Sequence, residues 1–282
     1  MRAASAGGDR LGAYGLCVHG VDVSPSELVQ APAHWPALEL RVRVTATPRP
    51  ELDYVDGDRA SLVLRSGGSV VVDRTADLAT FMLTARPSPS ALVHPYLAAV
   101  AAVRAHWSGR DSFHAGGFVA GGGVWGLLGD KGAGKSSTLA AMSRAGVAVI
   151  SDDVLILDGD NAFAGPRSID LRGDAAQRLG IGRPLGVIGQ RERWRLPLPT
   201  VDPELPFRGW VTLRWGPKVV VDQVRGSNRL RELLRHRALR VPPPVPAALV
   251  ELARRPLLAL TRPRGWSSLD GALERLLDAT SG

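Results

Sequence analysis

The clearest chemical signal in the sequence comes from eight consecutive residues. They match the pattern G-x-x-x-x-G-K-[ST] and are Gly129, Asp130, Lys131, Gly132, Ala133, Gly134, Lys135 and Ser136. Glycines in this pattern let backbone amides close around a di- or triphosphate, because glycine adopts positive φ at little cost. Lys135 would place a positive charge near the β and γ phosphates, and the Ser136 hydroxyl would ligate Mg²⁺. Together with Ser137, these residues form the predicted phosphate site.

The residues on either side of this loop have the patterns that a phosphate loop requires. Residues 124–128 predict a buried strand, and residues 136–145 predict a helix with apolar side chains spaced to face a sheet. The start of that helix would add the positive end of its dipole to an anion site. The alternative, a glycine-rich turn without a ligand, would not need this strand–loop–helix order. The pattern therefore favours a bound nucleotide.

Two adjacent carboxylates, Asp152 and Asp153, follow a predicted buried strand at 146–150. Ligands in open α/β sheets bind at the carboxyl ends of strands, so this position suits a site residue. One carboxylate could hold Mg²⁺, and the other could accept the proton of an attacking hydroxyl. A solvated turn is the alternative interpretation of the same pair.

His114 begins a further predicted strand, 113–119, fifteen residues before the first glycine of the loop. The order of His114, the loop at 129–136, a helix and then Asp152-Asp153 resembles the catalytic domain of the HPr kinase/phosphorylase family and its kinase-like relatives. This resemblance spans residues 114–157. It implies an ATP- and Mg²⁺-dependent phosphotransferase.

The resemblance also implies a role for each matched residue. Asp152 would be the general base that deprotonates a substrate hydroxyl, with His114 nearby to tune it, and Lys135 would bind the transferred phosphate. Ser136 and Asp153 would hold the metal, although the two aspartate roles could be exchanged. The acceptor would be a hydroxyl, expected to be a Ser, of a peptide or protein.

The chain departs from the bacterial regulators of this family. Their signature L-E-x-R-G-x-G is reduced here to the residues at 169–173, Ile-Asp-Leu-Arg-Gly. The chain is more similar to divergent relatives, some of which phosphorylate a Ser of a precursor peptide in natural-product pathways. Two other functions stay open: a nucleotide-binding regulatory or assembly subunit that transfers nothing, and a small-molecule kinase.

Several arginines are candidates for contacts with an anion. Arg191, Arg193 and Arg195 alternate with other residues, so a strand would put all three on one face. Three like charges together are costly unless something anionic meets them. They could clamp the γ-phosphate, and Arg193 is then the candidate for binding the nucleotide. Alternatively, they could dock an acidic peptide or lie on an exposed strand without a ligand. Arg167 and Arg172 are further clamp candidates.

The remaining patterns predict an α/β protein whose HPr-kinase-like P-loop core is accompanied by a small β-rich N-terminal subdomain. We expect an unassigned segment at 1–36, a β-rich subdomain with a linking helix at 37–110, and a nucleotide-binding domain with C-terminal helices at 111–282. Predicted elements outside the motif regions are the strands 38–44, 60–64 and 69–73, a helix at 92–104, a hairpin turn at Gly121–Gly123, and helices at 227–237, 247–254 and 268–279.

Composition limits the classes of function. The 282 residues carry 35 Lys and Arg against 27 Asp and Glu, a net charge of +8. The basic side chains are scattered, and no nucleic-acid-binding signature accompanies them, so we expect a nucleotide and an acidic peptide or protein as partners rather than a nucleic acid. A single cysteine excludes an intrachain disulfide. Without a secretory signal or a long apolar run, we expect a cytoplasmic protein without a membrane partner. The sequence leaves open whether the protein forms a homo-oligomer.

Overall fold

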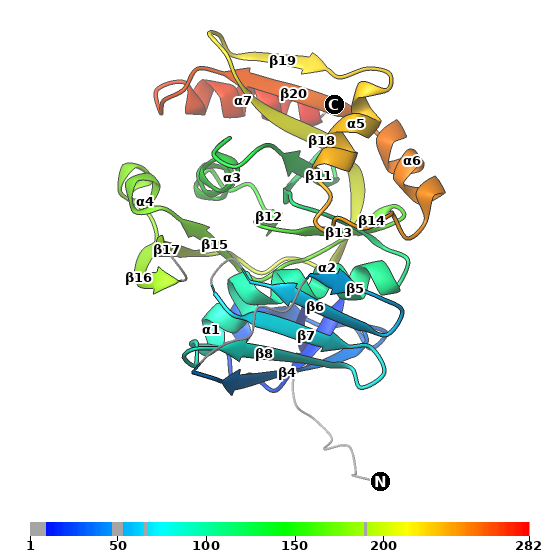
Figure 1. The fold of residues 1–282 in the computed structure, drawn as a ribbon. Coiled ribbons are helices and arrows are strands. Elements are labelled where there is room, and N and C mark those ends of the chain that lie inside the picture. Colours follow the sequence, from blue (N-terminus) through cyan, green and yellow to red (C-terminus); the bar gives the residue numbers. More distant parts are fainter. Residues whose placement is uncertain (1–9, 47–52, 65–66, 189–190, 282) are drawn as a thin grey trace.

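Two large β-sheets dominate the computed structural model, which describes residues 10–46, 53–64, 67–188 and 191–281 (Figure 1). The N-terminal residues form one sheet, and the rest of the chain builds a second sheet with most of the helices around it. The α/β fold class is therefore confirmed, while the assignment of the core to the HPr-kinase-like type stays a prediction.

The N-terminal sheet has eight strands in the order β3-β1-β2-β4-β8-β7-β6-β5. Their bounds are β1 Leu11–Ala13, β2 Leu16–His19, β3 Val29–Gln30, β4 Ala37–Val44, β5 Tyr54–Val55, β6 Arg59–Val63, β7 Ser69–Asp73 and β8 Leu78–Leu83. The predicted strands at 38–44, 60–64 and 69–73 correspond to β4, β6 and β7. Residues 11–30, for which the sequence predicted no element, add three strands to the same sheet.

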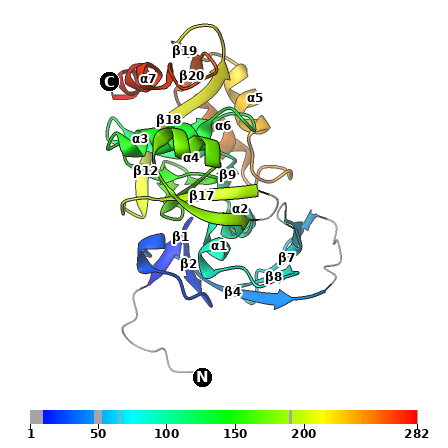
Figure 2. The ribbon, with the colours of Figure 1, turned by 90° about the vertical axis from the view of Figure 1, so that its left-hand side faces the viewer.

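Helix α2, Leu97–Trp107, lies between the two sheets (Figures 1 and 2). It contacts β7 of the first sheet and β9 and β13 of the second, so both of its faces are buried. The short helical turns α1, Pro89–Ala91, and η2, Leu92–Tyr96, lead into it. The predicted helix at 92–104 is confirmed from Leu97 onward, whereas the segment before it is kinked at His94, whose backbone angles are not helical. The alanine-rich sequence of α2 allows the close approach of both sheets.

The second sheet has nine strands and mixed direction. Its strands are β9 Asp111–Phe113, β10 Gly116–Ala120, β11 Gly123–Leu128, β12 Val149–Ser151, β13 Leu155–Asp158, β14 Asn161–Phe163, β18 Glu204–Trp215, β19 Val220–Gln223 and β20 Leu257–Arg262. The long strand β18 runs parallel to β11 on one side and to β20 on the other. Strands β18 to β20 were not predicted from the sequence.

Side chains from the two faces of this second sheet belong to different hydrophobic clusters. One cluster joins the sheet to α2 and the N-terminal sheet, and it includes Trp210, Phe113 and Leu155. The other joins the opposite face to α3, Lys135–Arg144, and α7, Leu269–Ser281. Because strand side chains alternate between faces, β11 contributes Leu128 to the first cluster and Leu127 to the second. Both ends of the phosphate loop are thus anchored in packed core.

Three more helices and a small sheet complete the fold. The three-stranded sheet has the order β15-β17-β16, and the bounds are β15 Ser168–Leu171, β16 Arg183–Ile188 and β17 Arg191–Pro197. The helices are α4 Gly173–Leu179, α5 Asn228–Arg235 and α6 Pro246–Arg254. The predicted C-terminal helices correspond to α5, α6 and α7. No helix in the described ranges is long and apolar enough to cross a membrane.

The predicted continuous strand at 113–119 is wrong. The structure divides it into β9 and β10, with a break at His114 and Ala115, where the Ala115 amide donates to the Phe113 carbonyl. β9 pairs with β13, whereas β10 pairs with β11 and β12. Because the two parts pair with different strands, the chain does not continue as one strand across His114 and Ala115.

Candidate active site

The loop 129–134 connects the end of β11 to the start of α3, as the sequence predicted. Gly132 and Gly134 have φ of 88° and 91°, a region that strongly favours glycine. A cavity of about 360 Å³ opens in front of the loop and the first turn of α3. The unsatisfied amides at a helix N-terminus favour an anion in such a position.

Lys135 and Ser136 stand at the start of α3 and both line this cavity. The Lys135 ammonium donates to the Gly129 carbonyl at 2.6 Å, so its side chain reaches back across the loop. Burial lowers the pKa of Lys135, against the opposing effect of the Asp152 and Asp153 carboxylates. Ser136 lies close enough to Asp152 to lower the pKa of its carboxyl. A cation and a hydroxyl therefore face the same space as the acidic pair.

Asp152 and Asp153 have different surroundings although they are adjacent. Asp152 is buried, at 6% exposure, and its Oδ1 accepts no hydrogen bond within the described part of the chain. Burial raises the pKa of Asp152 to about 6, with His94 and Ser136 opposing the shift and Asp153 and Asp170 adding to it. Asp153 is half exposed and lies 3.5 Å, Oδ1 to Nδ1, from His114. The ion pair that the structure shows for His114 is thus with Asp153.

The break between β9 and β10 places His114 at the cavity. Its backbone amide donates to the His236 carbonyl at 2.7 Å, at the end of α5. The preceding residue, at the end of β9, is also held there, because Phe113 forms an isolated bridge with Arg237. Helix α5 therefore fixes the position from which the imidazole reaches Asp153.

A buried ionic cluster lies behind Asp152 and consists of Asp170, Arg195 and His94. The Arg195 guanidinium donates to both carboxylate oxygens of Asp170, at 2.8 and 3.0 Å, and to the His94 carbonyl at 2.6 Å. His94 Nε2 lies 3.7 Å from Asp170 Oδ2. Burial alone would raise the pKa of Asp170, but His94 and Arg195 together hold it below its ordinary value. The Asp170 amide donates to Asp152 Oδ2 at 3.4 Å, which joins the cluster to the acidic pair.

The arginine strand is only partly as predicted. Residues 191–197 do form a strand, β17, but Arg195 is 2% exposed and belongs to the cluster above, so an exposed strand is excluded for it. Arg193 lines the cavity, and its buried Nε has no hydrogen-bond partner among the described residues. The side chain of Arg191 lies outside what the structure describes. Arg193 is therefore the member of this strand that can meet a ligand.

The two other arginine candidates differ in position. Arg172 lines the cavity beside Asp170. Arg167 does not: its buried guanidinium donates to the carbonyls of Val149, Ile150 and Pro199. Its role as an anion clamp is therefore excluded, and it instead ties β12 to the segment after β17.

Several residues that line the cavity were not identified as site residues from the sequence, among them Asp170, Trp215 and Arg262. Asp170 entered the sequence analysis only as part of a reduced signature, and Trp215 at the end of β18 was not a candidate. Arg262 at the end of β20 also lines the cavity. A short motif cannot indicate them, because they join the site through pairings between distant strands. The tract at 262–266, Arg-Pro-Arg-Gly-Trp, is a local signal of concentrated basic and aromatic side chains that could have pointed to Arg262.

The residues present fit a hydrated Mg²⁺ rather than a metal held by protein alone. Among the described residues no group of three or more His, Cys, Asp or Glu side chains could hold an ion. A serine hydroxyl beside an unpartnered carboxylate oxygen does match the way Mg²⁺ is held by one or two protein oxygens, waters and substrate phosphates. Ser136 with Asp152 or Asp153 would supply the protein ligands.

Comparison with known proteins gives little beyond this geometry. No family model matches the sequence, and no curated protein matches it. Among solved structures, the HPr(Ser) kinase/phosphatase from Coxiella burnetii is 11% identical over 60% of this chain and 88% of its own, with a TM-score of 0.31. This supports a distant similarity at most, and we draw nothing about function from it.

Proposed function

We propose that this protein is an ATP- and Mg²⁺-dependent kinase that transfers the γ-phosphoryl group to a hydroxyl, expected to be a Ser hydroxyl, of a peptide or protein. The observation that carries the proposal is the buried Asp152 Oδ1, which has no hydrogen-bond donor among the described residues and belongs to the same cavity as Lys135 and Ser136. A buried carboxylate oxygen without a partner is costly, so its position calls for a proton donor or a cation from a ligand.

The nucleotide phosphates would occupy the loop 129–136. Lys135 would leave the Gly129 carbonyl to bind the β and γ phosphates, and the amides at the start of α3 would face the same anion. Bound Mg²⁺ would neutralise the negative charge that develops on the phosphates during transfer. Ser136 and one of the two carboxylates would face it. This arrangement positions the γ phosphorus toward the acidic pair.

Transfer then needs a base for the acceptor hydroxyl. The hydroxyl oxygen bonds to the γ phosphorus, the bond from that phosphorus to the bridging β–γ oxygen breaks, and ADP leaves. Asp152 takes the hydroxyl proton through the oxygen that has no partner among the described residues. Asp153, held by His114, serves the metal side. Binding without transfer would not require a second carboxylate and an imidazole in this cavity.

Arginines are among the side chains that line the cavity of the acidic pair. Arg172 and Arg193 line it, and the buried Arg193 Nε is without a partner among the residues described. Arginine recognises carboxylates and phosphates through paired donors. We therefore expect an acceptor with acidic residues near its hydroxyl, such as an acidic peptide or protein.

The test is phosphoryl transfer from γ-labelled ATP with Mg²⁺. Peptide and small-molecule fractions of the source cells, separated by size, would be offered as acceptors to the wild type, Asp152→Asn, and the exposed control Asp278→Asn on α7. We expect label on a peptide or protein, with Asp152→Asn slower by about 10²- to 10⁴-fold and the control unchanged. Label in the small-molecule fraction would show that the acceptor is a small molecule rather than a peptide or protein. Unchanged transfer by Asp152→Asn would refute the assignment of Asp152 as the base.

Asp153→Asn separates the two carboxylates. If Asp152 is the base and Asp153 serves the metal, Asp153→Asn should raise the Mg²⁺ concentration needed for half-maximal rate, while Asp152→Asn should lower the rate at every Mg²⁺ concentration. The reverse pattern would exchange the two roles and leave the kinase assignment in place. Measuring rate against Mg²⁺ concentration for both variants is sufficient.

A further inference from the structure

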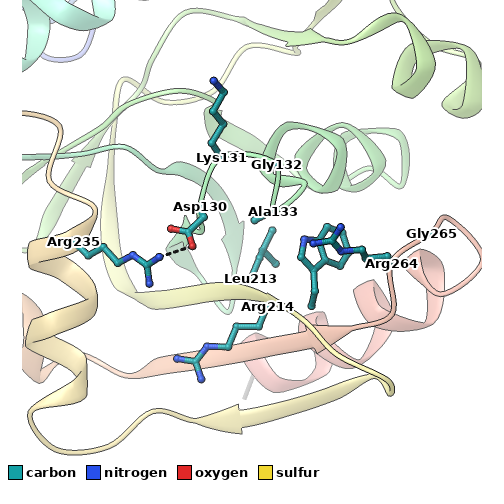
Figure 3. A pocket seen from close by; sticks show the side chains of 10 residues that line it. Asp130, Lys131, Gly132, Ala133, Leu213, Arg214, Arg235, Arg264 and Gly265 are labelled. Carbon is teal, nitrogen blue, oxygen red and sulfur yellow. Dashed lines mark hydrogen bonds and ion pairs between the residues drawn. The ribbon is translucent and has the colours of Figure 1, made fainter.

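A second, larger cavity lies on the other side of the phosphate loop and takes no part in the chemistry above. Its volume is about 900 Å³, within the range of small-molecule sites. Figure 3 shows Asp130, Gly132 and Ala133 of the loop on one side of it and Leu213, Arg214 and Arg264 on the other. The acidic pair and His114 line only the smaller cavity, so the larger one opens away from the reacting end of the loop.

Trp215, the last residue of β18, lines both cavities where they meet at the phosphate loop. A Cβ placed on Gly134 would lie only 3.7 Å from the Trp215 ring and 3.2 Å from the Arg262 guanidinium. The indole is therefore packed directly against the last glycine before α3. Trp215 is nevertheless partly exposed to solvent, unlike the fully buried Trp210 of the same strand. Its position gives a planar apolar surface beside the phosphate site.

Two guanidinium groups flank this indole. The Arg262 guanidinium lies 4.5 Å from the ring centroid, and it is fixed by a 2.9 Å bond to the Gly265 carbonyl. The Arg264 guanidinium lies 5.8 Å from the ring centroid, and its residue is exposed. Arg262 lines the smaller cavity and Arg264 the larger, so the larger cavity offers an aromatic ring and a planar cation together. Bases stack on both kinds of surface.

The charge of the larger cavity also favours a nucleotide. Four basic side chains line it, and the single carboxylate, Asp130, already pairs with Arg235 at 2.6 Å (Figure 3). An excess of positive charge attracts an anion, but it does not by itself select a base. The combination with a partly exposed indole beside Gly134 is what distinguishes this cavity from a plain phosphate site.

We infer that this larger cavity binds the nucleoside part of the nucleotide, with the base stacked against Trp215 and the Arg264 guanidinium. The inference rests on the proposed phosphate site, because the phosphate chain must pass from the loop into the cavity beside Gly134. Trp215 and Arg264 would then distinguish ATP from a bare phosphate chain, and they would take no part in phosphoryl transfer itself.

Comparing Mg-ATP with Mg-tripolyphosphate tests this inference, because both carry the phosphate chain and only one carries a base. Calorimetry would measure both ligands against the wild type, Trp215→Leu, and Trp107→Leu, a control whose indole donates instead to the Asp56 carbonyl near the N-terminal sheet. We expect Trp215→Leu to lower the affinity for Mg-ATP by about 5- to 150-fold and to change the affinity for Mg-tripolyphosphate by no more than about twofold. Trp107→Leu should change neither ligand.

Other outcomes separate the inference from the function on which it rests. If Trp215→Leu weakens both ligands equally, or neither, the indole is not a base platform although the phosphate site stands. If the wild type binds neither ligand, the phosphate site and the base site both fail. Arg264→Ala provides a second test that leaves the indole intact: because Arg264 is exposed, its loss should not impair folding, and it should weaken Mg-ATP selectively.

Discussion

Strand β11 has a glycine-rich segment at each end, and the two segments do different things. At its start, Gly121 and Gly122, with φ of 55° and 74°, turn the chain into an antiparallel hairpin with β10. At its end, the glycines of 129–134 open the chain into α3. Positive φ is common to both. The element after the glycines decides what happens to the backbone amides. A strand uses them in hydrogen bonds of the sheet, whereas the start of a helix leaves them free to bind an anion.

The surroundings of the two segments differ as well. A Cβ on Gly121 would meet the Thr280 carbonyl at 2.6 Å, so the hairpin turn lies against the end of α7. The second segment lies among ionisable groups: Arg235 of α5 pairs with Asp130, and Lys135 spans the loop to Gly129. Of these two segments, the second therefore has both the free helix start and the charges that a phosphate site needs.

The largest effect that should separate the two segments comes from Lys135. Lys135→Met removes the charge that the β and γ phosphates would meet, and we expect Mg-ATP affinity to fall about 100-fold or more, because hydrogen bonds and charge contacts to phosphate are among the strongest available. Lys218→Met, at an exposed position after β18, is the matched control and should bind normally. Titration calorimetry measures the Mg-ATP affinity of both variants. Equal affinities would show that the loop 129–136 is not the phosphate site.

Matched alanine substitutions test the comparison itself. Gly134→Ala and Gly122→Ala each force a side chain into positive φ, and each should lower the free energy of unfolding by about 1–2 kcal/mol. Of the two, Gly134→Ala also crowds the Arg262 guanidinium beside the phosphate loop, so it alone should weaken Mg-ATP binding, by about tenfold. Denaturant unfolding and calorimetry on both variants decide the matter. Similar losses of affinity in both would show that the glycines act only through stability.

Helix α5 supports the second segment, and Glu232 attaches that helix to β18. The pKa of Glu232 is brought down to about 2, first by His236, whose Nε2 lies 3.6 Å from Glu232 Oε1, and then by the Thr212 hydroxyl at 2.5 Å and the charge of Arg214. A carboxyl whose pKa is lowered on folding contributes stability above its unfolded pKa of 4.5 and loses it as pH falls toward 2. Glu232→Gln should therefore cost about 1–2 kcal/mol at pH 7, and the difference should shrink between pH 4.5 and pH 2. A pH-independent difference in denaturant unfolding would contradict this account.

The smallest effect should come from Arg235. Its ion pair with Asp130 is exposed on both sides, and such pairs contribute little to stability. Arg235→Ala should leave the unfolding free energy within about 0.5 kcal/mol, measured by denaturant unfolding. In calorimetry it should weaken Mg-ATP by no more than a few fold, since Asp130 is then left without its partner beside the phosphates. A loss as large as that of Lys135→Met would mean that the pair, rather than the lysine, organises the loop.

Local and distant features of the site differ in how far the sequence predicts them. Local features can be predicted from the positions of glycines and the spacing of apolar residues. They include the loop at 129–136, the helix after it and the hairpin at 121–123. Asp170, His94 and Arg195 come together only because β15 pairs with β17 and both lie against the segment before α2. The break at His114 likewise depends on the different partner strands of β9 and β10.

The candidate base illustrates the same limit. Asp152 and Asp153 could be placed at a strand end from the sequence, but their environments could not be distinguished. Burial of Asp152 comes from packing around β12 and β15, and the contact of Asp153 with His114 depends on the break after β9. Trp215 and Arg264, which we infer to bind the base, are far from the loop in sequence and join it through the β11–β18–β20 pairing.

The most direct measurement is a crystal structure of the protein with Mg²⁺ and a non-hydrolysable ATP analogue. We predict that the β and γ phosphates lie inside the loop 129–136, with Lys135 released from the Gly129 carbonyl and the γ phosphorus facing Asp152. The Gly121–Gly123 turn should be unchanged. An analogue bound away from this loop, or a γ-phosphate that points away from the acidic pair, would contradict the central claim that this cavity transfers a phosphoryl group.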